Sequence, residues 1–259
     1  MISSIAEIRT AKRVVVKVGS SSISGENVHQ IPVIVDALAA LHASGCEVVL
    51  VTSGAIASGL VPLNLVARPD DLPSQQAAAA VGQNVLMNRW QDALDRFDIL
   101  AGQVLLTAGD MENVESRTNA RAAMDRLLEL RILPIVNEND AVGTSEIRFG
   151  DNDRLAALVA VLVDADALVL LSDVDGLYTK PPHEEGAQRI EWVVFGDDLG
   201  GVEFGDIGAA GVGTGGASTK VAAAQYAAAA GTSVFITSSA LVAQALDGSA
   251  VGTWFEAKN

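Results

Sequence analysis

The chain has 259 residues and a formal net charge of −15, with 49% hydrophobic and only 4% aromatic residues. This length and apolar content suffice for one large α/β domain or two small lobes. The acidic charge and scarce aromatic residues argue against a nucleic-acid-binding protein, which needs a basic face and stacking surfaces.

Cysteine and histidine usage and the hydrophobic pattern exclude several other classes. The single cysteine rules out a disulfide framework, and the three histidines have no metal-ligand spacing. Residues 1–12 lack the pattern of a signal peptide, and the most apolar stretch, 155–163, is too short to span a bilayer. We therefore expect a cytoplasmic protein with no membrane segment and no metal site built from its side chains.

The first predicted element is a buried strand at residues 13–18, read R-V-V-V-K-V and followed by the turn G-S-S-S. Lys17 lies inside this strand, where an amine is costly unless it reaches a partner or a cleft. The alternative is an edge strand whose lysine extends to solvent. We favour a cleft, because ligand sites in open parallel sheets lie at the carboxyl ends of the strands.

Helices and strands alternate along the rest of the chain. Hydrophobic spacing predicts helices at 28–41, 72–97, 115–130, 154–163, 221–230 and 239–246. It predicts further strands at 47–51, 99–106, 132–136, 167–171, 233–237 and 253–255, with a loop or hairpin at 180–186. This alternation predicts an α/β fold, an open and mostly parallel sheet sandwiched by helices.

Small and polar residues follow several of the predicted strands. Residues 52–55 read T-S-G-A, and Ser53 is favoured as a substrate-binding hydroxyl because G-x-S-x-G is absent. Residues 137–140 read N-E-N-D, for which turn capping is the alternative to binding. Residues 150–153 read G-D-N-D before a helix, and helix capping explains only one of these polar residues.

A glycine-rich segment at residues 211–220, G-V-G-T-G-G-A-S-T-K, runs into a predicted helix. Glycines let backbone N–H groups converge, and a helix start adds unpaired donors and partial positive charge. With the cation of Lys220, this favours a phosphate cradle over the alternative, a flexible surface loop. It is not a Walker A loop, because Lys220 follows Thr219, and the G-x-G-x-x-G match lacks a preceding strand.

Taken in order, these strand ends resemble the amino-acid kinase family over nearly the whole chain. The motifs are K-V-G-S at 17–20, V-T-S-G-A-I-A at 51–57, N-E-N-D-A-V at 137–142, G-D-N-D at 150–153, S-D-V-D-G-L-Y-T at 172–179 and G-T-G-G-A-S-T-K at 213–220. N-E-N-D and G-D-N-D match the branch that phosphorylates glutamate. The resemblance implies transfer of the ATP γ-phosphoryl group, with Mg²⁺, to the γ-carboxylate of L-glutamate. In that branch this is the first step of proline biosynthesis, and proline inhibits it.

The resemblance also implies the site residues. Lys17 and Lys220 neutralise the transferring phosphoryl group, and Asp153 orients them. The implied acceptor-binding residues are Ser53, Gly54, Asn137, Asp140 and Asn152. The implied ATP-binding residues are Lys17, Ser172, Asp173, Thr214, Gly215, Gly216, Ala217, Ser218, Thr219 and Lys220. The chain departs from the family pattern at Ala217, where Met is usual, and at Ser172, where Thr is usual.

The chemistry of these residues agrees with the implied reaction. A carboxylate acceptor is already ionised at pH 7, so the reaction needs no strong general base. The difficulty is to bring two anions together, so catalysis rests on positioning and charge neutralisation. Asp140 can hold the ammonium of the substrate, and Ser53 and Asn152 can hold its carboxylate.

The same resemblance sets expectations for organisation and partners. We expect a single kinase domain over 1–259, with a glutamate-binding lobe near 1–165, an ATP-binding lobe near 166–259 and no C-terminal PUA domain. A homo-oligomer (dimer or tetramer) and hand-over of the acyl phosphate to glutamyl-phosphate reductase are expected, with no nucleic acid or membrane partner. Two alternatives stay open. One is a kinase of the same fold for N-acetylglutamate, aspartate, carbamate, UMP or isopentenyl phosphate; the other is a non-catalytic nucleotide-binding module.

Overall fold

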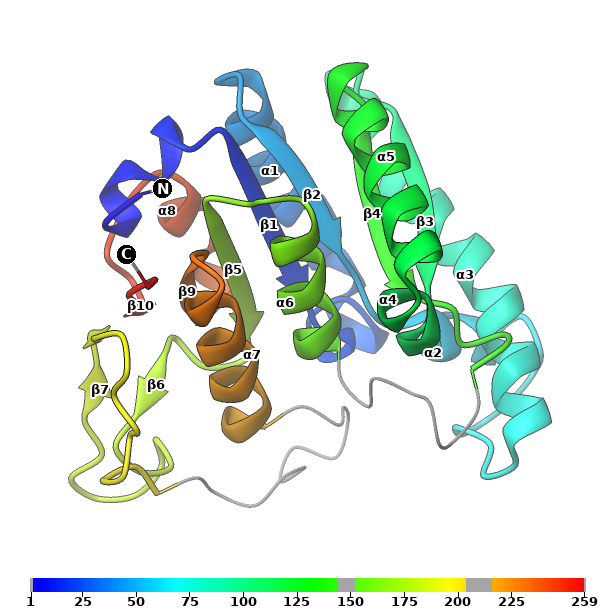
Figure 1. The fold of residues 1–259 in the computed structure, drawn as a ribbon. Coiled ribbons are helices and arrows are strands. Elements are labelled where there is room, and N and C mark those ends of the chain that lie inside the picture. Colours follow the sequence, from blue (N-terminus) through cyan, green and yellow to red (C-terminus); the bar gives the residue numbers. More distant parts are fainter. Residues whose placement is uncertain (1, 144–151, 204–215, 259) are drawn as a thin grey trace.

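A computed structural model describes residues 2–143, 152–203 and 216–258, which form a sheet with helices on both faces (Figure 1). The eight strands run in the order β3-β4-β2-β1-β5-β9-β10-β8. All neighbouring strands are parallel except β9 and β10. The predicted open, mostly parallel α/β sheet is therefore confirmed.

The strands of this sheet are short and mostly buried, as expected for a sheet covered on both faces. They are β1 (Arg13–Val18), β2 (Glu47–Val51), β3 (Ala101–Leu106), β4 (Leu133–Glu138), β5 (Ala167–Ser172), β8 (Trp192–Val193), β9 (Ser233–Ser238) and β10 (Thr253–Phe255). A separate antiparallel pair, β6 (Leu177–Tyr178) and β7 (Arg189–Ile190), flanks the segment predicted as a loop or hairpin.

The α-helices are α1 (Gln30–Ala43), α2 (Ala55–Leu60), α3 (Leu72–Leu94), α4 (Ala108–Glu112), α5 (Val114–Glu129), α6 (Asn152–Leu162), α7 (Ala217–Ala229) and α8 (Val242–Leu246). Short 3₁₀ helices are η1 (Ile5–Thr10), η2 (Ser20–Ser22), η3 (Gly25–His29), η4 (Asp95–Phe97) and η5 (Ser239–Leu241). Figure 1 shows α5, α6 and α7 on one face of the sheet and α1 and α8 on the other.

Two hydrophobic cores lie on the two faces of the sheet. In β1, Val14 and Val16 face the core that contains α1, α3 and α8, whereas Val15 faces the core that contains α5, α6 and α7. Side chains alternate along a strand, so Lys17 points to the same face as Val15. The position of Lys17 in a central strand thus places its amine beside α6 and α7.

Several predicted boundaries need correction. The segment predicted as one helix over 72–97 is α3 followed by η4, and Asp98, at φ 54°, ends it in a left-handed conformation. Helix α7 begins at Ala217, so Lys220 lies in its first turn rather than before the helix. Strand β4 continues through Asn137 and Glu138, which were expected to follow the strand.

Two short helices, α2 and α4, were not predicted, and a close glycine contact explains the first. A Cβ at Gly59 would lie 2.0 Å from the Ala78 carbonyl oxygen, and one at Gly82 would lie 1.8 Å from the Ala55 carbonyl oxygen. Only glycine permits this approach of two backbones. Helix α2 therefore depends on packing against α3, a long-range contact that its own sequence does not show.

Candidate active site

The candidate site is built around Asp153, in the first turn of α6. Its Oδ1 lies 2.6 Å from Lys17 Nζ, and its Oδ2 lies 3.0 Å from Lys220 Nζ. The Thr219 hydroxyl lies 3.4 Å from the same Oδ2 and 2.9 Å from the Gly216 carbonyl oxygen. The structure thus brings together the three residues to which the sequence assigns catalysis.

This cluster is withdrawn from solvent. Asp153 is 0% exposed, Lys17 3% and Lys220 9%. A buried charge is tolerated when it is paired, and here two ammonium groups share one carboxylate. Asp153 therefore holds two ammonium groups near the carboxyl end of β1, where cations suit an anionic ligand.

The turn after β1 borders the Lys17 amine. A Cβ at Gly19 would lie 3.7 Å from Lys17 Nζ, and η2 follows directly. The Ser22 hydroxyl lies 2.7 Å from that of Ser239, which lies 3.3 Å from the carbonyl oxygen of Ser172. This serine contact joins the carboxyl ends of β1, β5 and β9. Ser22 and Ser239 were not predicted, although both follow predicted strands.

Several residues assigned to the acceptor follow β2 and β4, which lie on the side of β1 away from β5. Gly54 follows β2 with φ +94°, and a Cβ there would lie 3.1 Å from the Ser24 hydroxyl. Its neighbour Ser53 is half-buried, as is Asp140, which follows β4. Helix α2 starts directly after Gly54.

A chain of buried amides connects the acceptor residues. Asn152 Nδ2 donates to the Thr52 carbonyl at 2.5 Å and to Asn137 Oδ1 at 2.8 Å. Asn137 Oδ1 also accepts from the Glu138 backbone N–H at 2.9 Å, and Asn137 Nδ2 donates to Gln83 Oε1 at 2.8 Å. Sequence reasoning missed Gln83, because it lies in mid-helix with no motif around it.

The residues assigned to the nucleotide are described in part. Ser172 ends β5, buried, and its hydroxyl donates to Asp173 Oδ1 at 3.0 Å. Gly216 is the N-cap residue of α7 and has no side chain that could accept from the first backbone N–H groups of the helix. The next four residues form the first turn of α7. Thr214 and Gly215 lie outside the described residues, as do the earlier glycines of the segment.

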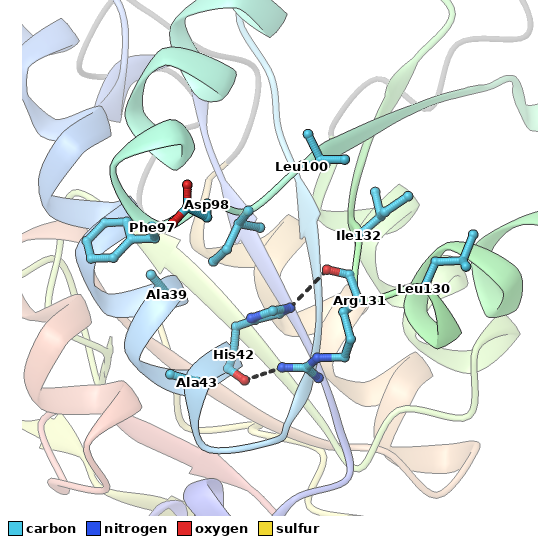
Figure 2. Close-up of a pocket in the computed structure, with 10 residues that line it drawn as sticks. Ala39, His42, Ala43, Phe97, Asp98, Leu100, Leu130, Arg131 and Ile132 are labelled. Carbon is cyan, nitrogen blue, oxygen red and sulfur yellow. Dashed lines mark hydrogen bonds between the residues drawn. The ribbon is translucent and has the colours of Figure 1, made fainter.

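A hollow of about 320 Å³ lies elsewhere, beside the amino ends of β3 and β4 (Figure 2). His42 and Arg131 meet at its wall: His42 Nε2 lies 3.2 Å from the Arg131 carbonyl oxygen, and the Arg131 guanidinium donates to the His42 carbonyl. Burial lowers the pKa of His42, and the Arg131 cation lowers it further. Because this hollow is at the opposite edge of the parallel sheet, it is separate from the lysine–carboxylate cluster.

Within 2–143, 152–203 and 216–258, no three His, Cys, Asp or Glu side chains are grouped so as to hold a metal ion. None of the helices placed in these segments has the length and apolar character needed to cross a bilayer.

The comparisons with known proteins agree with this geometry. The amino acid kinase family matches residues 12–238. The chain therefore belongs to the amino acid kinase family. Its fold is similar to that of the carbamate kinase from Giardia lamblia bound to AMP-PNP, with a TM-score of 0.68 and 17% identity over 96% of this chain and 100% of that one.

Closer sequence relatives are glutamate 5-kinases. The glutamate 5-kinase of Leifsonia xyli is 66% identical over 249 residues, covering 96% of this chain and 92% of that one. The glutamate 5-kinase of Clavibacter michiganensis is 67% identical over 253 residues, covering 98% and 97%. The chain is thus a kinase, and it resembles glutamate 5-kinases along nearly its whole length.

Proposed function

We propose that the chain transfers the γ-phosphoryl group of ATP to the γ-carboxylate of L-glutamate, giving L-glutamyl 5-phosphate, the first step of proline biosynthesis. The observation that carries this proposal is the buried Asp153 carboxylate between Lys17 and Lys220. The 66% identity to glutamate 5-kinases supports the choice of acceptor.

The lysine–carboxylate cluster suits phosphoryl transfer between two anions. The attacking carboxylate and the transferring phosphoryl group both carry negative charge, so the barrier falls where fixed cations lie beside them. Lys17 and Lys220 supply these cations, and Asp153 holds both ammonium groups in place. Preorganised charges act more strongly here than in water, because the cluster is buried.

The nucleotide is proposed to bind along α7 and the end of β5. Gly216 caps α7 without a side-chain bond, so the N–H groups of the first turn suit a phosphate. Thr214, Gly215, Ala217, Ser218 and Thr219 are assigned with it from the family pattern. Ser172 and Asp173 are proposed to contact the same ligand. Mg²⁺ bound to the ATP phosphates supplies further charge neutralisation, because hard phosphate oxygens are its preferred ligands.

Hydrogen bonding refines the roles of two acceptor residues. Both N–H donors of the Asn152 amide are engaged, with Thr52 and Asn137, so within the described part of the chain Oδ1 remains for a ligand. An acceptor atom suits the substrate ammonium, so we assign Asn152 there rather than to the carboxylate. Asn137 is only 1% exposed. We therefore propose that it acts on the substrate through Asn152.

The remaining acceptor contacts follow the chemistry of glutamate. Asp140 is assigned to the ammonium group, beside Asn152 Oδ1. Ser53 and the Gly54 turn are assigned to a carboxylate, for which a hydroxyl and backbone N–H groups are suitable donors. The Asp140→Ala variant is expected to raise KM for L-glutamate while kcat changes less.

The decisive experiment measures ADP release with Mg-ATP and L-glutamate, beside aspartate and N-acetylglutamate, with and without proline. Turnover that depends on glutamate supports the proposal, and suppression by proline supports feedback inhibition. Turnover only with another acceptor would overturn the substrate, and ATP binding without any turnover would indicate a non-catalytic module.

Finer expectations belong to the same proposal. The labile acyl phosphate product suggests direct hand-over to glutamyl-phosphate reductase, and co-purification or channelling would test it. A dimer or tetramer in the cytoplasm is proposed from the family resemblance, and light scattering would measure the assembly. The division into a glutamate-binding lobe near 1–165 and an ATP-binding lobe near 166–259 stays a prediction.

A further inference from the structure

The side-chain amides of Gln83, Asn137 and Asn152 form a hydrogen-bonded series beside the candidate site, and backbone contacts fix which end of each asparagine amide is oxygen. A backbone N–H can only donate, so the atom of Asn137 that meets the Glu138 N–H at 2.9 Å must be Oδ1. The amide of Asn152 is fixed in the same way, because the Thr52 carbonyl can only accept. Both asparagine orientations therefore follow from backbone groups rather than from a choice between two amide flips.

These orientations determine that of Gln83. Since Asn137 Oδ1 faces Glu138 and Asn152, Asn137 Nδ2 faces Gln83 at 2.8 Å. The atom of Gln83 at that contact must be Oε1, because two N–H groups cannot bond to each other. Gln83 Nε2 then lies on the far side, where it is buried and has no hydrogen-bond partner among the described residues.

Close packing holds Gln83 in this place. Its neighbour Gly82 sits against the start of α2, where an added Cβ would lie 1.8 Å from the Ala55 carbonyl oxygen and 2.4 Å from the Gly59 nitrogen. Gln83 is itself only 7% exposed. The glycine contact thus fixes α3 against the Gly54 turn and brings the Gln83 amide to β4.

We propose that Gln83 is a positioning residue of the acceptor site, which holds the Asn137 amide through Oε1 and, through it, the Asn152 amide that faces the acceptor. A buried amide with one unpartnered donor is unfavourable for stability, so packing alone does not account for glutamine here. Methionine would fill a similar volume without that penalty, but it would leave Asn137 Nδ2 without an acceptor. The proposal rests on the proposed function for the identity of the acceptor.

The test compares three variants by steady-state kinetics with L-glutamate and Mg-ATP. Gln83→Met removes the acceptor for Asn137, and we expect about a tenfold higher KM for glutamate with KM for ATP unchanged within about twofold. Gln83→Glu keeps an oxygen toward Asn137, and we expect it to restore most of the affinity for glutamate. The double variant Gln83→Met/Asn137→Ala should match Asn137→Ala alone, because Gln83 acts through Asn137.

Gln91 offers a matched control on the same helix. Its Oε1 accepts from the Ala101 backbone N–H at 2.8 Å and its Nε2 donates to the Ile99 carbonyl at 3.1 Å, near the start of β3. Gln91→Met is expected to lower the melting temperature and leave KM for glutamate unchanged. Should Gln83→Met fail to fold by circular dichroism, Gln83→Leu takes its place.

The outcomes separate this inference from the proposed function. Wild-type turnover with glutamate tests the function, and the ratio of variant to wild-type KM tests Gln83. If the wild type uses a different acceptor, the ratio is measured with that acceptor. An unchanged acceptor KM in folded Gln83→Met, or additive effects in the double variant, would overturn the positioning role.

Discussion

Lys17 and Lys220 contact opposite oxygens of a single carboxylate, at 2.6 Å and 3.0 Å. The two lysines come from β1 and α7, and the carboxylate comes from the first turn of α6 between them in the chain. Each ammonium group is thereby held by one half of Asp153. The contact therefore ties β1, α6 and α7 together at the place proposed for the transferring phosphoryl group.

The first prediction concerns the carboxylate itself. Asp153→Asn removes the buried carboxylate that both ammonium groups contact, and loss of one partner of a buried ion pair costs about 3–5 kcal/mol. We expect the free energy of unfolding, measured with urea, to fall by this amount. We also expect ATP to stabilise the variant more than the wild type, because the phosphates take the place of the carboxylate.

An exposed ion pair provides the control for this variant. Asp36 lies 2.6 Å from Arg96 with 56% of its side chain exposed. Asp36→Asn is expected to cost less than about 1 kcal/mol, since water screens such pairs. Equal losses for the two variants would show that the buried cluster does not contribute as described.

The second prediction concerns the lysines. Lys17→Met and Lys220→Met each remove one cation beside the transferring group while keeping the aliphatic stem. We expect kcat to fall by about 10²–10³-fold in each, the range seen when one preorganised charge-stabilising donor is lost. Circular dichroism confirms folding, and turnover within threefold of wild type in either variant would refute the assigned role.

The third prediction concerns the contact between α2 and α3. Gly82→Ala places a methyl group 1.8 Å from the Ala55 carbonyl oxygen, so the helices must separate. We expect a loss of about 1–3 kcal/mol in unfolding free energy, as in other overpacked sites. Gly201→Ala is the control, because none of the described atoms lies within 4 Å of its added Cβ. It should leave the urea midpoint unchanged, and a similar loss in both would exclude the steric explanation.

The fourth prediction uses the single cysteine. Cys46 is 2% exposed, and burial raises its pKa to about 12, with the nearby Asp166 and Glu47 carboxylates acting in the same direction. A thiol reacts as the thiolate, so the native protein at pH 8 should react very slowly with a disulfide reagent. One thiol per chain should appear in guanidinium chloride, and rapid reaction without denaturant would show that the start of β2 opens.

The fifth prediction concerns pH and His42. Burial first and the Arg131 cation second lower its pKa in the folded protein below the ordinary value of about 6.5. The unfolded chain then binds more protons, so the contribution of His42 is present above about pH 6.5 and is lost as the pH falls through the folded pKa. Urea midpoints from pH 8 to 5 should fall less steeply for His42→Gln, and parallel curves would contradict the prediction.

The positions of most strands and the mostly parallel sheet were readable from the sequence, and the reasons are physical. Strand β1 has a β-branched run that only a doubly covered strand accommodates, and its bounds agree with the prediction. Lys17, inside that run, indicated that its amine reaches a partner or a cleft, and the structure pairs it with Asp153. Both inferences rest on the pattern of neighbouring residues and on the cost of burying a charge, and a single sequence is enough to apply them.

The parts that sequence reasoning missed depend on contacts between distant segments. Helix α2 forms against α3 through Gly59 and Gly82, and neither glycine signals a partner in its own neighbourhood. Gln83 lies in mid-helix, where a glutamine ordinarily faces water. Only the placement of α3 beside β4 shows that its amide contacts Asn137.

The position of β1 in the sheet also affects a chain that is still being synthesised. Strand β2 can pair with one side of β1 early, whereas β5, its other neighbour, begins only at Ala167. Until then the run V-V-V exposes unpaired backbone groups, which favours aggregation between nascent chains. Fragments that end before β5 should therefore accumulate as insoluble material and depend on chaperones.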